Sequence, residues 1–230
     1  MSKYRFEFRA MTVDDREELA TLVAECYQSR ETITKHIGES FEQCFENYAK
    51  PVVYSVMPNL SFVCIDHFGK NGNEIIGCLL CSKVEVEQIQ YDEPMNASKA
   101  FEILNNEFKQ RFLALHKDDE VKDYLSKECA CLKDEYAEKG IATKLCYLVL
   151  SNAKQLGYGF ALMMPTVNEA KHLATKKLKA KKLFGICYED FEYNGVQYFK
   201  GITDPKTYDA YEVALADFDS DRHRVELKFD

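Results

Sequence analysis

Apolar residues recur at helical spacing in several parts of the chain. They lie three or four residues apart, which places them on one face of an amphipathic helix. One segment with this spacing begins after Asp15. Three others cover residues 98–115, 141–153 and 168–178. A further helix is predicted over residues 40–48, ending before Pro51 because proline lacks the amide that continues a helix.

Short apolar runs bounded by polar or glycine-containing turns predict strands. The expected strands cover residues 6–10, 60–66, 74–86, 128–132 and 160–164, with residues 69–72 as the turn between the second and third. The pair Asn194-Gly195 is typical of a tight turn and predicts a closing hairpin of residues 184–193 and 196–199. The mixture of strands and helices indicates an α/β fold.

Composition narrows the class of protein. A chain of 230 residues with 46% apolar content can bury one sizeable core, so we expect a single domain over residues 1–230. The net charge of −8 argues against non-specific nucleic-acid binding and suits a small cationic substrate. Nine scattered cysteines and the lack of a signal-like start predict a reduced, cytoplasmic protein. The apolar runs are too short to cross a bilayer, so we expect no membrane insertion.

Residues 129–145 carry the clearest chemical signal, a strand that runs through a small-residue turn into a helix. The first amides of a helix that starts near Ile141 lack partners, and the positive end of its dipole suits a diphosphate. Gly140 allows close approach of a ligand, Ala142 keeps the first turn narrow, and Lys139 adds positive charge. The alternative is an ordinary strand-to-helix turn without a ligand.

The segment Tyr136-Ala-Glu-Lys-Gly-Ile-Ala142 resembles the acetyl-CoA signature of the GNAT superfamily of N-acetyltransferases, Gln/Arg-x-x-Gly-x-Gly/Ala. Gly140 and Ala142 occupy the two small positions, whereas Ala137 stands where the family usually has Gln or Arg. One side-chain contact to the diphosphate is therefore expected to be missing.

This resemblance implies the GNAT fold, a mixed central sheet flanked by helices in which acetyl-CoA enters where two strands splay apart. The two strands would be residues 128–132 and 160–164. Backbone amides at Leu132 and Lys133 would polarise the thioester carbonyl. The expected cofactor-binding residues are Cys131, Leu132, Lys133, Ala137, Glu138, Lys139, Gly140, Ile141, Ala142, Thr143 and Asn168.

Residues 26–34, followed by Gly38, resemble the early Glu-Pro-Leu segment of insect and nematode arylalkylamine N-acetyltransferases, in which the Glu is the general base. Glu31 occupies that position, and Thr32 replaces the Pro. An amine arrives as an ammonium with a pKa of about 10 and must lose a proton before it attacks. The alternative for Glu31 is an exposed carboxylate at a helix end.

The residue that protonates the leaving thiolate is unassigned. Thr175 stands where many of these enzymes have a Tyr, and Val167 and Lys171 stand where the insect enzymes have serines. His172 is the candidate acid. Asn168 either contacts the pantetheine arm or caps the helix that follows it.

Metal and redox sites are not expected. Five scattered His and no second paired Cys motif make zinc improbable. Cys78 and Cys81 have a redox-like spacing, but residues three apart on a strand point to opposite faces, which favours a core role.

The resemblance implies an acetyl-CoA-dependent N-acetyltransferase that works by direct transfer in a ternary complex, as a monomer or homodimer. The implied acceptor is a small arylalkylamine. The alternatives are another amine, such as a polyamine, an amino sugar or a protein N-terminus, and a degenerate acetyl-CoA-binding module.

Overall fold

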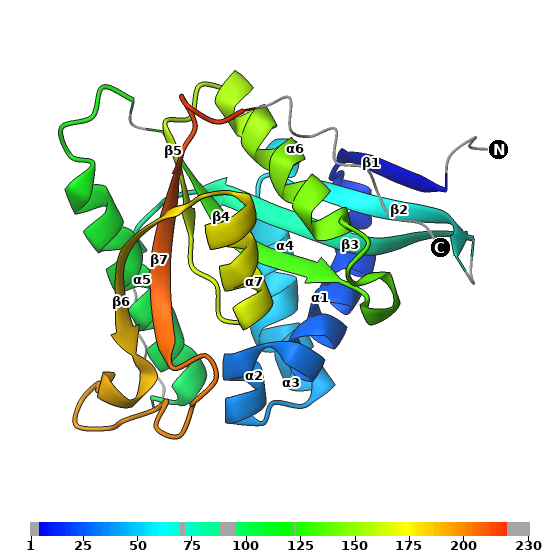
Figure 1. Ribbon diagram of the computed structural model, residues 1–230. Helices are drawn as coiled ribbons and strands as arrows, with labels where there is room; N and C mark the ends of the chain where they lie inside the picture. Colours follow the sequence, from blue (N-terminus) through cyan, green and yellow to red (C-terminus); the bar gives the residue numbers. More distant parts are fainter. Residues whose placement is uncertain (1–4, 70–71, 88–94, 122, 220–230) are drawn as a thin grey trace.

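We analysed a computed structural model of the chain, which describes residues 5–69, 72–87, 95–121 and 123–219. Its strands are β1 Phe6–Ala10, β2 Phe62–Gly69, β3 Gly72–Lys83, β4 Tyr124–Leu132, β5 Phe160–Met163, β6 Lys181–Cys187 and β7 Thr207–Ala214. They form one sheet in the order β1-β2-β3-β4-β5-β7-β6 (Figure 1). β4 and β5 are parallel and the other neighbours antiparallel, so the sheet is mixed, as expected.

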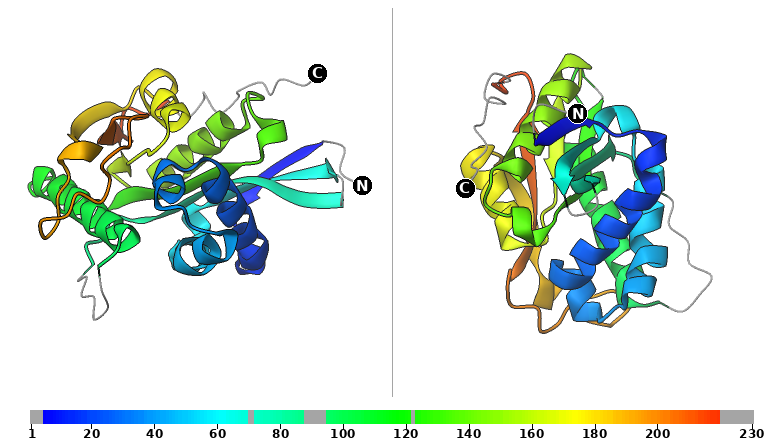
Figure 2. Two further views of the ribbon diagram at one scale, coloured as in Figure 1. Left: turned by 90° about the horizontal axis from the view of Figure 1, so that it is seen from below. Right: turned by 90° about the vertical axis from the view of Figure 1, so that its right-hand side faces the viewer.

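Helices pack on both faces of this sheet. They are α1 Arg16–Arg30, α2 Thr32–Ile37, α3 Phe41–Cys44, α4 Lys50–Ser55, α5 Ala97–Leu115, α6 Ile141–Gln155 and α7 Asn168–His172, and π-helical turns cover Phe45–Ala49 and Leu173–Lys177. α1 to α4 lie on one face and α6 on the other (Figure 2). None of the helices in the described residues is long and apolar enough to cross a membrane.

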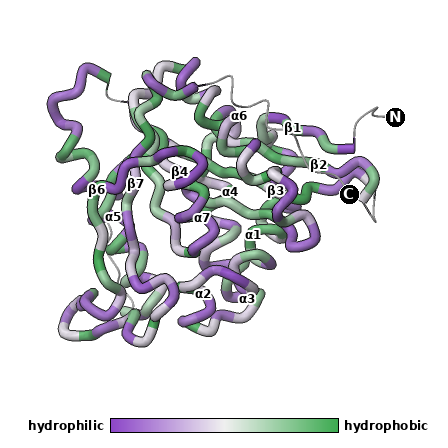
Figure 3. The backbone as a smooth tube through the Cα atoms, in the orientation of Figure 1, coloured by the Kyte–Doolittle hydropathy of each residue, from purple (hydrophilic) through white to green (hydrophobic). Residues whose placement is uncertain are grey.

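Alternation along the central strands divides the core. On β3, Cys78 and Leu80 pack against α1, whereas Leu79 and Cys81 pack against α6. Side chains of a strand alternate between its faces, so one strand supplies both layers. The prediction that Cys78 and Cys81 point to opposite faces is confirmed. The central strands are accordingly mostly hydrophobic in Figure 3, and the peripheral loops mostly hydrophilic.

Most predicted elements are present at or near their expected bounds. β1 matches residues 6–10, and α1, α5, α6 and β5 lie where periodicity placed them. β4 begins earlier than predicted, at Tyr124. Lys70 and Asn71 of the predicted turn between β2 and β3 lie outside the described residues.

The prediction that the second helix ends before Pro51 is wrong. The chain stays helical from Phe41 through Ser55, with a π-helical turn at Phe45–Ala49 directly before α4. In that wider turn the amide of Lys50 donates to the carbonyl of Phe45. The wider turn relaxes the close approach of a proline ring to the preceding turn, which explains why Pro51 is tolerated.

The predicted closing hairpin is also wrong in its partners. Asn194 and Gly195 have positive φ angles of 52° and 79°, and Tyr193 forms an isolated bridge with Val196. The strand partner of β6 is instead β7, with Cys187 opposite Thr207. β7 was missed because Asp209 and Glu212 interrupt its apolar pattern. Both are buried, and each is paired with a lysine.

Candidate functional site

β5 pairs with only the first part of β4. Their parallel pairing ends at Lys127 opposite Met163, where β5 stops while β4 continues to Leu132. A bulge marks the same point, because Leu80 of β3 pairs with Cys129 and Cys81 with Lys127, which leaves Glu128 as the extra residue. A bulge bends a strand and increases its twist. The predicted separation is therefore present on β4, whose residues 128–132 have no partner in β5, whereas residues 160–163 of the other predicted strand are paired with residues 124–127.

The gap between the splayed strands exposes part of β4. Ala130 is exposed although it lies on a central strand. The amide of Lys133 donates to the carbonyl of Ile76 at 2.9 Å. Because hydrogen-bonding direction alternates along an antiparallel strand, the amide of Leu132 points away from β3, into the gap. Two backbone amides were predicted to polarise the thioester carbonyl. That of Leu132 points into the gap, whereas that of Lys133 is hydrogen-bonded to Ile76 of β3.

The N-terminus of α6 follows this gap and has the features of an anion cradle, which we define as residues 137–143. Gly140 is the N-cap in the left-handed region, with φ of 86°, a conformation that a side chain disfavours. No side chain caps the helix there, and the amide of Lys144 makes the bond to the Gly140 carbonyl at 2.9 Å. The amides of Ile141, Ala142 and Thr143 therefore have no intrahelical acceptor.

The loop before the cradle is anchored to β2. The Tyr136 hydroxyl donates to Asp66 Oδ2 at 2.8 Å, and Arg5 pairs with the same carboxylate at 3.1 Å. Burial and the hydrogen bond to Asp66 raise the pKa of Tyr136 to about 12. The pKa of Asp66 is lowered, because hydrogen bonds from Arg5 and the Phe68 amide outweigh its burial. Sequence reasoning gave Asp66 no role.

Glu31 lies at the junction of α1 and α2, and its carboxylate is buried, with 6% of the residue exposed. The predicted alternative, an exposed helix-end carboxylate, is therefore wrong. Oε2 caps α2 by accepting from the Thr34 amide at 2.6 Å. Oε1 is buried and has no hydrogen-bond partner among the described residues. A buried carboxylate oxygen without a partner is costly, so a bound cation or water is favoured there.

The preceding residue, Arg30, places this junction beside the gap. Its guanidinium donates to the carbonyl of Leu132 and pairs with Asp134 at 2.6 Å. Arg30 thus joins the end of α1 to the splayed end of β4. Glu31 follows directly, so the unpaired carboxylate belongs to the chain segment packed against the gap.

Further polar side chains that the prediction missed lie near Glu31. Burial is the main cause that raises the pKa of Tyr188 and Tyr208, and the negative charge of Glu31 adds to it. The buried Tyr188 hydroxyl has no hydrogen-bond partner among the described residues. Glu128, at the bulge, accepts from Ser82 at 2.6 Å and pairs with Lys109 at 3.1 Å. Glu128 could have been noticed in the sequence, because it is a glutamate within a predicted apolar strand. We call Glu31, Glu128, Tyr188 and Tyr208 the buried polar cluster.

The charge of Glu128 is stabilised although the side chain is largely enclosed. Burial acts to raise its pKa, but Lys109 and the hydrogen bond from Ser82 outweigh that effect, and the pKa is lowered. Glu128 is therefore a paired carboxylate, whereas Glu31 retains an unpaired oxygen.

Most polar side chains of α7 and the turn after it have partners other than a ligand. Lys171 pairs with Asp209 at 2.7 Å, and the Thr175 hydroxyl donates to the Lys171 carbonyl at 2.8 Å. Asn168 is the first residue of α7 and bonds Asp204 at 2.6 Å, while Val167 is the N-cap, so the capping alternative for Asn168 is wrong. His172 lies exposed on α7.

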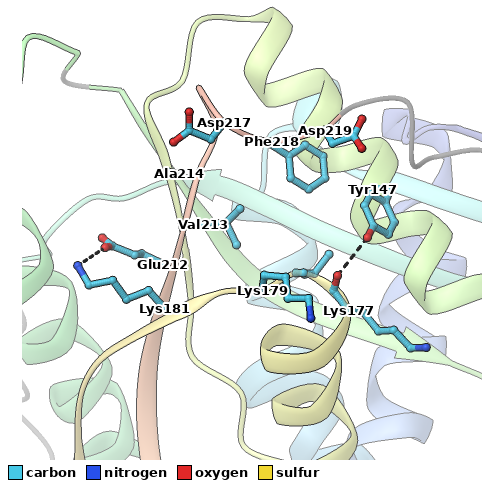
Figure 4. A pocket seen from close by; sticks show the side chains of 11 residues that line it. Tyr147, Lys177, Lys179, Lys181, Glu212, Val213, Ala214, Asp217, Phe218 and Asp219 are labelled. Carbon is cyan, nitrogen blue, oxygen red and sulfur yellow. Dashed lines mark hydrogen bonds and ion pairs between the residues drawn. The ribbon is translucent and has the colours of Figure 1, made fainter.

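A pocket of about 350 Å³ lies away from the splayed strands, between α6, the turn after α7 and β7 (Figure 4). Its walls carry Lys177, Lys179 and Lys181 but also Glu212 and acidic residues of the segment after β7. None of the predicted cofactor-binding residues lines it. No group of three or more His, Cys, Asp or Glu side chains within the described ranges is arranged to hold a metal ion.

Comparison with known proteins gives a clear result for the fold. No protein-family model matches the sequence, and no curated protein sequence matches it. Solved structures do match. A protein described as arylalkylamine N-acetyltransferase 7 of the yellow fever mosquito Aedes aegypti aligns with a TM-score of 0.72 at 14% identity, over 91% of this chain and 87% of that chain.

Two further structures agree. An apo mutant of agmatine N-acetyltransferase aligns with a TM-score of 0.72 at 14% identity, over 92% of this chain and 100% of that chain. A mosquito arylalkylamine N-acetyltransferase like 5b aligns with a TM-score of 0.71 at 12% identity, over 91% and 99%. With its mixed sheet, its splayed strands and these structural matches, the chain has the fold of the GNAT superfamily of N-acetyltransferases.

Proposed function

We propose that the protein is an acetyl-CoA-dependent N-acetyltransferase that transfers the acetyl group directly to a small primary amine in a ternary complex. One observation carries the proposal: the end of β4 that has no partner in β5 precedes an uncapped helix N-terminus and is contacted by Arg30, the neighbour of a buried carboxylate with an unpaired oxygen. These are the groups needed to bind a diphosphate and to deprotonate an amine. We further propose that residues 1–230 form one domain with this role.

The cradle and the splayed end of β4 fit acetyl-CoA. The amides of Ile141, Ala142 and Thr143 are oriented by the helix to hold a diphosphate, and the exposed Ala130 leaves room along β4. The Leu132 amide, directed into the gap, is the donor for the thioester carbonyl. Acetyl-CoA supplies the activated acetyl group.

Glu31 is the proposed general base. Its Oε2 is held by the Thr34 amide, which fixes the carboxylate and leaves Oε1 to accept a proton from the ammonium, directly or through one water. Burial of the carboxylate excludes competing solvent. Removal of the proton exposes the nitrogen lone pair, and the neutral amine then attacks the thioester.

Protonation of the leaving thiolate needs less assistance than deprotonation of the amine. A thiol pKa of about 8.5 makes the thiolate a tolerable leaving group without a dedicated acid. Lys171 and Thr175 are held by Asp209 and by the α7 backbone, respectively. His172 stays a prediction for the acid, to be tested by substitution.

For the acceptor we propose an arylalkylamine. Three lines support it: the segment around Glu31, the tyrosines of the buried polar cluster, and structural neighbours described as arylalkylamine N-acetyltransferases. A polyamine-like acceptor is the second candidate. Neighbours with this fold include an agmatine N-acetyltransferase, and the buried polar cluster contains two carboxylates.

The experiment is release of free CoA thiol from acetyl-CoA over a panel of amines. The panel contains dopamine, serotonin, tryptamine, phenylethylamine, agmatine and spermidine, with a no-amine control and calorimetry of CoA binding. Turnover limited to aromatic amines supports the proposal, and turnover limited to agmatine or spermidine supports the second candidate. Tight CoA binding without amine-dependent thiol release would favour a binding module and overturn the enzymatic proposal.

A further inference from the structure

Five of the nine cysteines belong to the core on one face of the sheet, and four of them come from α1, β3 and β4, the fifth being Cys44 of α3. Cys26 comes from α1, Cys78 from β3, and Cys129 and Cys131 from β4. The sulfur atoms of Cys129 and Cys131 are 3.5 Å apart, Cys78 lies directly opposite Cys131 on the neighbouring strand, and Cys26 packs in the same core. We call these four residues the thiol cluster. It packs between α1 and the splayed end of β4.

The members of the thiol cluster differ in how well a small oxidant can reach them. Cys26 and Cys131 are 8% and 6% exposed, whereas Cys78 and Cys129 are each 1% exposed. The sulfur of Cys26 lies 3.7 Å from the carbonyl oxygen of Leu132, the residue that follows Cys131. Cys26 thus contacts the backbone directly after Cys131, at the more accessible side of the thiol cluster.

Charge and accessibility together favour Cys26 as the first thiol to react. The pKa of Cys129 is also lowered, because hydrogen bonds with Cys131 and Cys78 outweigh its burial, but Cys129 is only 1% exposed. The hydrogen bond with Cys131 lowers the pKa of Cys26, and the Arg30 guanidinium acts in the same direction against the effect of burial. A thiolate is the nucleophilic form of cysteine. Cys26 is thus the most accessible of the four buried thiols, and it lies beside a positive charge.

We propose that Cys26 and Cys131 are a peroxide-sensitive pair that forms a disulfide between α1 and β4. The Cys26 thiolate attacks one peroxide oxygen, which gives a sulfenic acid and releases water or an alcohol. The Cys131 thiol then attacks the sulfenic sulfur, so that an S–S bond forms and water leaves. The two thiols lose two electrons and the peroxide gains them.

Other pairings within the thiol cluster fit less well. Cys129 and Cys131 are two residues apart on one extended strand, so their Cα atoms are about 6.6 Å apart, near the upper limit for a disulfide. Cys78 lies directly opposite Cys131 across the strand pair, but it is almost fully buried. Of the four, Cys26 alone comes from a helix, and its exposed fraction, 8%, is the largest.

The disulfide would fix α1 to the splayed end of β4, five residues before Glu31. An effect on acetyl transfer rests on the proposed function, whereas formation of the bond does not. Peptide mapping therefore tests the inference even in a protein that shows no turnover, and the two proposals fail separately.

The test treats the native protein with one equivalent of hydrogen peroxide, blocks free thiols with iodoacetamide, and maps the unreduced digest by mass spectrometry. We expect a Cys26–Cys131 peptide, the loss of two free thiols, and full reversal by dithiothreitol. Cys26→Ser and Cys131→Ser should each abolish the linked peptide. Cys187→Ser, which removes the exposed cysteine at the end of β6, should retain it.

The pairing is overturned by any of three results in the wild-type digest. These are oxidation confined to Cys187, conversion of Cys26 to sulfinic acid without a linked peptide, and a disulfide between a different pair. Since all three are read from the wild-type protein, poor folding of a serine variant does not affect the conclusion.

Discussion

Tyr136, which lies just before the cradle, is hydrogen-bonded to Asp66 of β2. The Tyr136 hydroxyl donates at 2.8 Å to a carboxylate that is fully buried on β2, and Arg5 pairs with the same carboxylate. Tyr136 lies only four residues before Gly140, the N-cap of α6. The position of the cradle is therefore set partly by a side chain far away in the sequence.

Tyr136→Phe should lower the free energy of unfolding by about 1–2 kcal/mol at neutral pH, because a buried hydrogen bond to a charged group is lost. Denaturant unfolding measures this. Tyr54→Phe is the matched control, since Tyr54 is 43% exposed and its loss should have little effect. Equal stability of Tyr136→Phe and wild type would contradict the anchoring role.

The same pair predicts a pH dependence. The pKa of Tyr136 is raised to about 12 in the folded protein, against about 10 when unfolded. Its contribution is therefore fully present below pH 10 and is lost as the pH rises from 10 to 12. We expect the stability difference between wild type and Tyr136→Phe to shrink over that window, as measured by urea unfolding at a series of pH values. A constant difference would argue against the raised pKa.

Glu31→Gln should reduce kcat/KM for the amine by about a hundredfold or more at neutral pH, because the amide cannot accept the proton. Binding of acetyl-CoA should stay unchanged, as measured by calorimetry. The glutamine oxygen can still accept from the Thr34 amide, which keeps the cap. Glu25→Gln, an exposed carboxylate on α1, is the control. Unchanged kcat/KM in Glu31→Gln would remove Glu31 from the mechanism.

Ala142→Leu should weaken acetyl-CoA binding by about tenfold or more, equivalent to about 1.4 kcal/mol. A bulky side chain in the first turn of α6 would occupy the space that the diphosphate needs. Ala142→Ser keeps the turn narrow and should bind acetyl-CoA as wild type does. Undiminished affinity in the leucine variant would contradict the cradle assignment.

Substitution by alanine should destabilise the protein at His116 but change its stability little at His172. His116 is buried and hydrogen-bonded to Asp119 at 2.7 Å and to Glu212 at 3.0 Å, so its removal should cost about 1–3 kcal/mol of stability. His172 is exposed, and its removal should change stability by less than about 0.5 kcal/mol. Thermal unfolding distinguishes the two. If His172 is the acid, kcat must also fall in His172→Ala, and an unchanged kcat would exclude that role.

Local patterns predicted the elements whose signal is contained within a single segment. The amphipathic helices α1, α5 and α6, the strand β1 and the turn at Gly140 all have periodicity or turn chemistry within a few residues. The splayed strands followed from resemblance to a known fold. β7 escaped prediction because the lysines and the histidine that pair with its buried acidic residues come from other segments of the chain.

The amino-acid sequence by itself determined the α/β class, the anion cradle and the position of Glu31. Only the tertiary structure decided that Glu31 is buried with an unpaired oxygen, that Lys133 has no free amide and that Glu128 lies at the bulge. It also brought together Cys26 and Cys131, which lie on α1 and β4. Burial, pairing and pKa depend on neighbours that are distant in the chain, and a local pattern contains no record of those neighbours.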